Sequence, residues 1–291
     1  MSAGAGCIGM ESAAKVKRPL TMVLVAVAAG ILIAVVTLRI IENQLIYFPP
    51  RYPEGFPAPQ TYQGEVEEVW LLTEDGVKIN AFYRSNPPSK QVLLWFHGNA
   101  ENIGYGLEHL RALAKIGVNI LAVDYRGYGK SEGKPDEAGV YHDADAAYDY
   151  LIKQRHFRPE DIIIYGHSLG GAVAIDLASR RPCGGLIIQS SFINARAMAR
   201  RMFAIPLIEY VVKSRFDSLQ KIREVHAPIL IVHGTRDDLV PFRMGQQLFA
   251  AAPEPKRFYP IEGAGHNDLM EIGAVSYLAC LQRFVANSVR P

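Results

Sequence analysis

The strongest chemical signal in the sequence is a serine flanked by glycines, within Gly166-His167-Ser168-Leu169-Gly170. An apolar run at 162–165 precedes it, and a helical pattern at 169–181 follows it. A serine on a sharp turn between a strand and a helix projects its hydroxyl from the edge of the sheet, and the glycines leave space where the two elements crowd each other. The pattern therefore predicts that Ser168 is a nucleophile.

A serine hydroxyl needs a base, and the base needs a partner that fixes its tautomer. Of the eight histidines, only His266 follows the last expected strand, in the loop 263–268. The loop 233–241 follows another expected strand and carries two neighbouring carboxylates, Asp237 and Asp238. Loops at one edge of a sheet can bring such groups to the serine. We therefore expect a triad of Ser168, an aspartate of this loop and His266.

Short apolar segments alternate with helical patterns along most of the chain, after a hairpin at 66–72 and 77–83. This alternation is typical of an α/β fold with a mostly parallel, doubly wound sheet. The segment 192–226 interrupts the alternation with helical, apolar-rich sequence and is predicted to form a small lid. The expected strands are 92–96, 120–123, 162–165, 186–189, 229–232 and 257–259, and the expected helices are 106–116, 136–154, 169–181, 241–251 and 274–286.

The region from about residue 66 to residue 284 resembles the α/β-hydrolase superfamily in its serine-hydrolase branch. Four blocks carry this resemblance: Phe96-His97-Gly98-Asn99, the run DYRGYGKS at 124–131, the glycine-flanked serine, and the two loops with Asp237 and His266. The run HGNAEN at 97–102, together with an apolar N-terminal segment, is similar more narrowly to membrane-associated α/β-hydrolase-domain proteins of bacteria, fungi and animals.

The resemblance implies an α/β-hydrolase fold and a role for individual residues. In the family pattern G-x-x-D-x-x-V-P the aspartate belongs to the triad, which selects Asp237 over Asp238. The family also places two backbone N–H groups at the oxyanion, and these correspond to the N–H groups of Asn99 and Leu169. Some animal members remove acyl groups from proteins. Close relatives have an acidic residue and a proline where this chain has QSSF at 189–192, which leaves the geometry of the lid open.

The sequence positions of the other notable polar residues favour structural roles for them. We expect Asp124 and Arg126 to order their loop as a pair, and Asp143 and Asp145 to lie on a solvated helix face. No metal site is expected, and the chemistry requires no cofactor. The histidines outside the triad are expected to order the loop after a strand (His97), to pack in the core (His167 and His233), or to lie on helices and the surface (His109, His142, His156 and His226).

Composition limits the class of protein. The 291 residues suffice for one large α/β domain with an anchor, and 49% of them are hydrophobic. The formal net charge is only +2, without a dense basic stripe beyond the extreme N-terminus, so no nucleic-acid partner is expected. The three cysteines, Cys7, Cys183 and Cys280, give neither a disulfide framework nor a zinc spacing. Composition leaves the oligomeric state unknown.

An uncharged apolar segment at 20–38 would measure roughly 28 Å as a helix, close to the hydrocarbon thickness of a bilayer. We therefore expect a transmembrane helix at 19–41. A cleaved signal peptide is the alternative, with Ala26-Val27-Ala28 as the cleavage site, although the apolar run is longer than a usual signal-peptide core.

The residues around this segment predict its orientation. Lys15, Lys17 and Arg18 precede it, which favours a cytoplasmic N-terminus and an extracytoplasmic domain, periplasmic in a bacterium. The chain then divides into a basic segment (1–18), the transmembrane helix (19–41), a linker (42–62) and the hydrolase domain (63–289). The linker is rich in proline and contains aromatic residues that either line the membrane interface or pack on the domain: Tyr47, Phe48, Tyr52 and Phe56.

These features predict a membrane-anchored serine hydrolase that cleaves carboxylic esters or thioesters through an acyl-enzyme on Ser168. Its expected substrate is an acyl ester or thioester, on a lipid or an acylated protein. A serine peptidase on the same fold is an alternative, because the triad does not distinguish amides from esters. A non-catalytic membrane-bound scaffold is the other. A chain that begins near Gln60 is expected to fold and to keep its rate on short esters.

Overall fold

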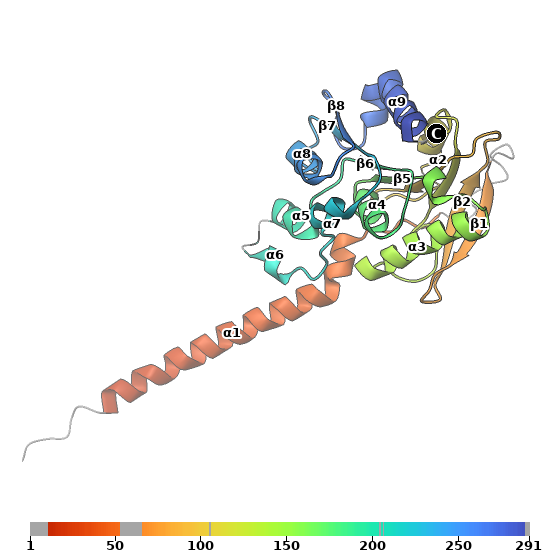
Figure 1. The fold of residues 1–291 in the computed structure, drawn as a ribbon. Coiled ribbons are helices and arrows are strands. Elements are labelled where there is room, and N and C mark those ends of the chain that lie inside the picture. The colour runs from red at the N-terminus through yellow and green to blue at the C-terminus, as the bar shows by residue number, and fades with distance from the viewer. Residues whose placement is uncertain (1–10, 53–65, 105, 204, 206, 289–291) are drawn as a thin grey trace, which may run out of the picture.

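The computed structural model describes residues 11–52, 66–104, 106–203, 205 and 207–288. A long helix, α1 (Glu11–Ile46), projects from a domain in which helices cover both faces of a sheet (Figure 1). The expected α/β fold, with an antiparallel N-terminal hairpin and a helical segment at 192–226, is confirmed.

The sheet has eight strands in the order β1-β2-β4-β3-β5-β6-β7-β8. β2 is antiparallel to β1 and β4, and the other neighbours are parallel. The strands are β1 (Glu67–Leu72), β2 (Lys78–Arg84), β3 (Val92–Phe96), β4 (Asn119–Val123), β5 (Ile162–His167), β6 (Gly185–Gln189), β7 (Ile229–Gly234) and β8 (Lys256–Ile261). Every residue of β3 to β7 is buried, as expected for parallel strands covered on both faces.

Two helical layers complete the core. One apolar cluster joins the sheet to α3 (Glu137–Lys153), α4 (Leu169–Arg180) and α8 (Phe242–Ala251). The other joins the opposite face to α2 (Leu107–Ala114) and α9 (Leu269–Ser288). α9 begins before the expected position 274, and non-helical backbone at Ala274 interrupts it. The sequence pattern therefore predicted the part of α9 that follows the break, and it missed the part before it.

The 192–226 segment folds as short helices beside the carboxyl edge of the sheet. It contains α5 (Ala195–Met202), α6 (Ile208–Val211), α7 (Ser218–Lys221) and the 3₁₀ turn η3 (Ile222–Glu224). Another 3₁₀ turn, η2 (Pro159–Asp161), leads into β5. Asn194 caps α5 because its side-chain oxygen accepts a hydrogen bond from the backbone N–H of Ala197 at 2.8 Å.

The junction after the expected transmembrane segment differs from the expected linker. α1 continues to Ile46, since helical backbone is favourable until Pro49 and Pro50 end it. Tyr47 is 2% exposed and packs edge-on against Phe216. The Tyr52 hydroxyl donates to a carboxylate oxygen of Asp124 at 2.9 Å, whereas Phe48 is half exposed. Phe56 and the prolines Pro53, Pro57 and Pro59 lie outside the described residues.

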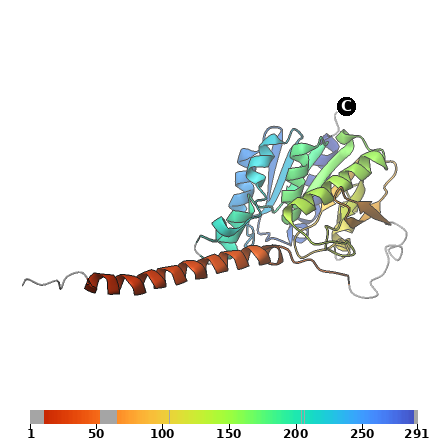
Figure 2. The ribbon, with the colours of Figure 1, turned by 90° about the horizontal axis from the view of Figure 1, so that it is seen from below.

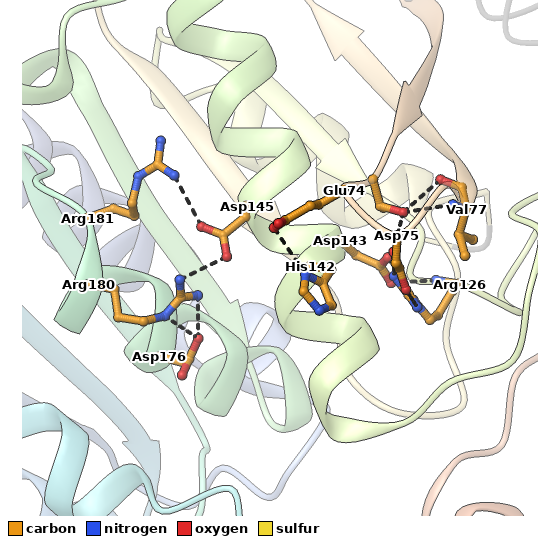
Figure 3. A network of polar contacts seen from close by, with 11 residues as sticks. Glu74, Asp75, Val77, Arg126, His142, Asp143, Asp145, Asp176, Arg180 and Arg181 are labelled. Carbon is orange, nitrogen blue, oxygen red and sulfur yellow. Dashed lines mark hydrogen bonds and ion pairs between the residues drawn. The ribbon is translucent and has the colours of Figure 1, made fainter.

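Two predictions about charged residues were wrong (Figure 3). Asp143 is fully buried rather than solvated, and its carboxylate accepts hydrogen bonds from the backbone N–H and the Nε of Arg126 at 2.8 and 2.9 Å. The same guanidinium donates to Asp75 in the β1–β2 turn. Arg126 therefore joins the hairpin to α3, while Asp124 bonds to Tyr52 and to the backbone N–H of Ile103. Helical periodicity did not reveal this pairing because the partners come from separate elements.

Candidate active site

Ser168 lies at the turn where β5 ends and α4 begins. Its backbone has φ 53° and ψ −114°, a conformation that side-chain-bearing residues rarely adopt. The flanking glycines explain how the turn closes: a Cβ on Gly166 would lie 2.1 Å from the carbonyl oxygen of Gly170, and a Cβ on Gly170 would lie 2.1 Å from that of Phe96. The strained backbone therefore holds the Ser168 side chain at the carboxyl edge of the sheet, as the motif predicts.

The structure brings Ser168, His266 and Asp237 into one hydrogen-bonded chain. His266 Nε2 lies 3.0 Å from Ser168 Oγ, and His266 Nδ1 lies 2.8 Å from a carboxylate oxygen of Asp237. With the Nδ1 proton donated to the carboxylate, Nε2 is free to accept the serine proton. All three residues are less than a tenth exposed. Asp237 lies in the loop after β7, and His266 lies in the loop after β8.

Asp237 uses its two carboxylate oxygens differently. Oδ1 accepts hydrogen bonds from the backbone N–H groups of Leu239 and Val240, at 3.1 and 2.8 Å, and Oδ2 faces His266. Burial opposes ionisation, but the hydrogen bonds and the nearby imidazoles outweigh it and hold the pKa of Asp237 well below its usual range. The adjacent Asp238 is exposed and turned away, so the loop itself separates the two carboxylates.

A second imidazole at Asp237 was missed. His233 Nε2 lies 2.9 Å from the carbonyl oxygen of Val240 and 3.3 Å from Asp237 Oδ2, and the residue is fully buried. His233 was expected to pack in the core, which it does, but it also orders the aspartate loop. The four-residue spacing from His233 to Asp237 was the available signal.

A carboxylate–imidazole pair beside the serine was also missed. His167 Nδ1 lies 3.6 Å from a carboxylate oxygen of Glu101, and its ring lies 5.1 Å from that of His266. Glu101 also accepts a hydrogen bond from the backbone N–H of Gly98 at 3.1 Å. Burial raises the pKa of Glu101, but His167 and the Gly98 N–H outweigh it and lower the pKa to about 2. This pair joins the loop after β3 to the serine turn.

Asn99 and Leu169, the expected oxyanion donors, line the same cavity as Ser168. Leu169 is the first residue of α4, where backbone N–H groups lack partners within the helix. The Asn99 side chain holds the loop to the end of α1: its Nδ2 donates to the carbonyl oxygen of Ile46 at 2.6 Å, and its Oδ1 accepts from the Phe48 N–H and the Tyr128 hydroxyl. No pattern in the sequence indicates this connection between Asn99 and α1.

Metal ligation and thiol chemistry have no support in the described residues. Within the part of the chain that the structure describes, no three histidine, cysteine or acidic side chains are grouped to hold a metal ion. Cys183 and Cys280 are unpaired thiols, and burial raises the pKa of Cys183 to about 12. Cys7 lies outside the described residues.

Comparison with known proteins places this chain in a family. The family model described as "Serine aminopeptidase, S33" matches residues 87–221. An uncharacterised protein of Mycobacterium tuberculosis is 32% identical over 272 residues, covering 93% of this chain and 95% of that protein. Alpha/beta hydrolase domain-containing protein 17C of Mus musculus is 37% identical over 209 residues, covering 72% of this chain and 63% of that protein.

Solved structures agree with these relatives. An esterase of Pyrococcus furiosus, Pf2001, superimposes with a TM-score of 0.69 at 24% identity, covering 82% of this chain and 98% of that one. An α/β-hydrolase of Vibrio vulnificus gives a TM-score of 0.64 at 26% identity, covering 75% and 82%. Alpha/beta hydrolase domain-containing protein 17B of Xenopus laevis is 37% identical over 226 residues, covering 77% of this chain and 76% of that protein. Together with the strand order and the serine turn described above, this relationship shows that the chain belongs to the α/β-hydrolase superfamily.

Proposed function

We propose that the protein is a membrane-anchored serine hydrolase that cleaves carboxylic esters or thioesters through an acyl-enzyme on Ser168. The observation that carries the proposal is the chain of hydrogen bonds from Asp237 through His266 to Ser168, at the wall of an apolar cavity. The names of the Pyrococcus esterase and of the mouse α/β-hydrolase agree with hydrolysis.

The reaction follows from the positions of the protons. Ser168 Oγ forms a bond to the acyl carbon while His266 Nε2 takes its proton, and the imidazolium is stabilised by ionised Asp237. The backbone N–H groups of Asn99 and Leu169 would stabilise the oxyanion. When the ester C–O or thioester C–S bond breaks, His266 gives the proton to the leaving group. Water activated by His266 then releases the acid and restores Ser168.

The cavity favours an acyl ester over the peptidase alternative. Glu42 is the only charged side chain among its described lining residues, and both of its carboxylate oxygens already accept hydrogen bonds from backbone N–H groups. An aminopeptidase needs a carboxylate that receives the free α-ammonium group of its substrate. An apolar lining instead suits the hydrocarbon part of an acyl group.

The anchoring of the domain is part of this proposal. The described part of α1 contains a stretch, Thr21–Ile46, with mean hydropathy high enough to cross a membrane, and its side chains at 21–34 are all exposed. A core helix would bury these residues. Basic residues before the apolar stretch support a cytoplasmic N-terminus and an extracytoplasmic hydrolase domain.

A fluorophosphonate probe tests the proposal, since it reacts with an activated serine. The full-length protein should be labelled and should hydrolyse p-nitrophenyl acetate. The Ser168→Ala variant should lose labelling and lose about 10³-fold or more of its ester turnover. The Ser190→Ala variant is the matched control, because Ser190 is buried next to β6 outside the triad. Wild-type labelling of Ser168→Ala would refute the assignment, and an unlabelled wild type would favour the non-catalytic scaffold.

A further inference from the structure

The cavity at Ser168 is bordered by the end of α1, which was expected to belong to the anchor and the linker, and by the 192–226 segment, which was expected to form a small lid of the domain. Its volume is about 400 Å³, within the range of sites for small ligands. One wall comes from the end of α1, with Leu38, Ile41 and Leu45. Another comes from the 192–226 segment, including Met198 and Ile208. The last turns of α1 are therefore a wall of the candidate active site.

A buried carboxylate fixes α1 to this segment. Glu42 is 7% exposed, and its two oxygens accept hydrogen bonds from the backbone N–H groups of Lys213 and Ser214 at 2.8 and 2.6 Å. A carboxylate removed from water is expensive unless it is paired in this way. The contact holds α1 in one position against the segment, and it leaves the remaining lining of the cavity uncharged.

The same helix continues from the cavity into the apolar stretch that is proposed to cross the membrane. α1 runs from the cavity past α6 and away from the domain (Figure 2). The 192–226 segment, whose helix α6 contacts α1, exposes large apolar side chains: Met202, Ile205, Leu207 and Tyr210 are each 49–68% exposed. A bilayer around α1 would cover these side chains, which water would otherwise contact.

We infer that the cavity is the acyl site for a bilayer lipid, whose hydrocarbon chain enters between α1 and the 192–226 segment. This inference rests on the proposed function and names its substrate class. The carbonyl carbon reaches Ser168 while the chain lies along Ile41 and Leu38. Ile41 and Leu38 precede Ile46 by roughly 7 and 12 Å along the helix. A palmitoyl chain extends that far, and an acetyl group does not.

Substitutions at two neighbouring residues of α1 test whether the end of this helix forms a wall of the acyl site. Ile41→Trp fills the cavity from a lining position, whereas Ile40→Trp adds the same ring at a side chain that is 75% exposed and outside the lining. Full-length variants in detergent are compared on p-nitrophenyl acetate and p-nitrophenyl palmitate. Ile41→Trp should lower the ratio of the palmitate rate to the acetate rate by about 10-fold or more. Ile40→Trp should match wild type on both.

The acetate rate and fluorophosphonate labelling show whether each variant is folded. If the palmitate rates of Ile41→Trp and Ile40→Trp are equal while both variants are labelled, the inference is overturned and the serine hydrolase stands. If the wild type is neither labelled nor active on acetate, the proposed function fails and this inference fails with it. If Ile41→Trp also loses labelling, the Ile41→Ala variant replaces it. An unchanged ratio of palmitate to acetate rates in Ile41→Ala then refutes the claim that α1 lines the acyl site.

A second experiment identifies the source of the acyl chain. The full-length protein is reconstituted in phosphatidylcholine vesicles that contain monopalmitoylglycerol, and it is compared with the same protein given a soluble S-palmitoyl peptide. Faster turnover of the vesicle ester supports entry from the bilayer. Faster turnover of the peptide thioester overturns the lipid assignment and identifies an acylated protein as the substrate class.

Discussion

The side-chain amide of Asn99 donates a hydrogen bond to the carbonyl oxygen of Ile46 at 2.6 Å. One partner belongs to the loop after β3, and the other is the last residue of α1. The bond satisfies a carbonyl at the end of a helix, where intrahelical donors are missing. It also ties the position of the Asn99 backbone N–H, a proposed oxyanion donor, to the position of α1.

We predict that this bond matters for catalysis. Asn99→Asp keeps an acceptor for the Phe48 N–H and the Tyr128 hydroxyl but cannot donate to Ile46. Ester turnover should fall about 10-fold, because a misplaced oxyanion donor weakens transition-state stabilisation. The measurement is kcat on p-nitrophenyl acetate, with KM determined alongside. Unchanged kcat in a stably folded Asn99→Asp protein would contradict the prediction.

The contacts of α1 change the expectation for a chain that begins near Gln60. Such a chain lacks the wall of the cavity, and it leaves Nδ2 of Asn99 and the N–H groups of Lys213 and Ser214 without the partners that α1 supplies. We therefore expect its rate on short esters to fall about 10-fold or more. A chain that begins at Thr37 keeps these contacts and is the matched control. Equal short-ester rates for the two shortened chains would show that the contacts are dispensable.

The two neighbouring carboxylates should differ sharply. Asp237→Asn removes the charge and the acceptor that fix the tautomer of His266, so kcat should fall by about 10³- to 10⁴-fold. Asp238→Asn alters an exposed side chain and should change kcat by less than about 2-fold. Steady-state rates on p-nitrophenyl acetate separate the two. A reversal of this order would mean that the loop has a different register in solution.

The stability of the domain should depend on His109 at acidic pH. Its ring stacks on Trp95 and lies within hydrogen-bond distance of the Tyr165 hydroxyl, at 3.1 Å. Burial lowers the pKa of His109 to about 4, below its value of 6.5 in an unfolded chain. Between these values the unfolded chain binds the proton and the folded chain does not, so stability falls as the pH drops from about 6.5 to about 4.

Replacing this imidazole should therefore reduce the acid sensitivity. His109→Phe should lose less stability than wild type between pH 7 and pH 4, by on the order of 2 kcal/mol. The melting temperature, followed by tryptophan fluorescence, is the readout. His226→Phe is the control, because His226 is exposed and should leave the pH profile unchanged. Parallel profiles for His109→Phe and wild type would argue against the assigned protonation.

Local pattern was sufficient to predict most of the domain from sequence. Apolar runs such as 92–96 became strands because parallel strands in this fold are buried on both faces and leave an unbroken hydrophobic signal. Gly166 and Gly170 indicated the turn at Ser168 because a Cβ at either position would meet backbone atoms. The order of Ser168, Asp237 and His266 could be predicted because each residue follows an apolar strand, at the ends of β5, β7 and β8.

Contacts between distant segments were decided only by the tertiary structure. The pairing of Arg126 with Asp143 and the approach of His167 to Glu101 depend on how separate elements pack, which no local periodicity encodes. Glu42 follows the apolar segment in the sequence, yet it is buried because two backbone N–H groups of the 192–226 segment compensate its desolvation. The sequence predicted the three residues of the proposed triad and the apolar helix separately, and folding placed the end of that helix against the cavity at Ser168.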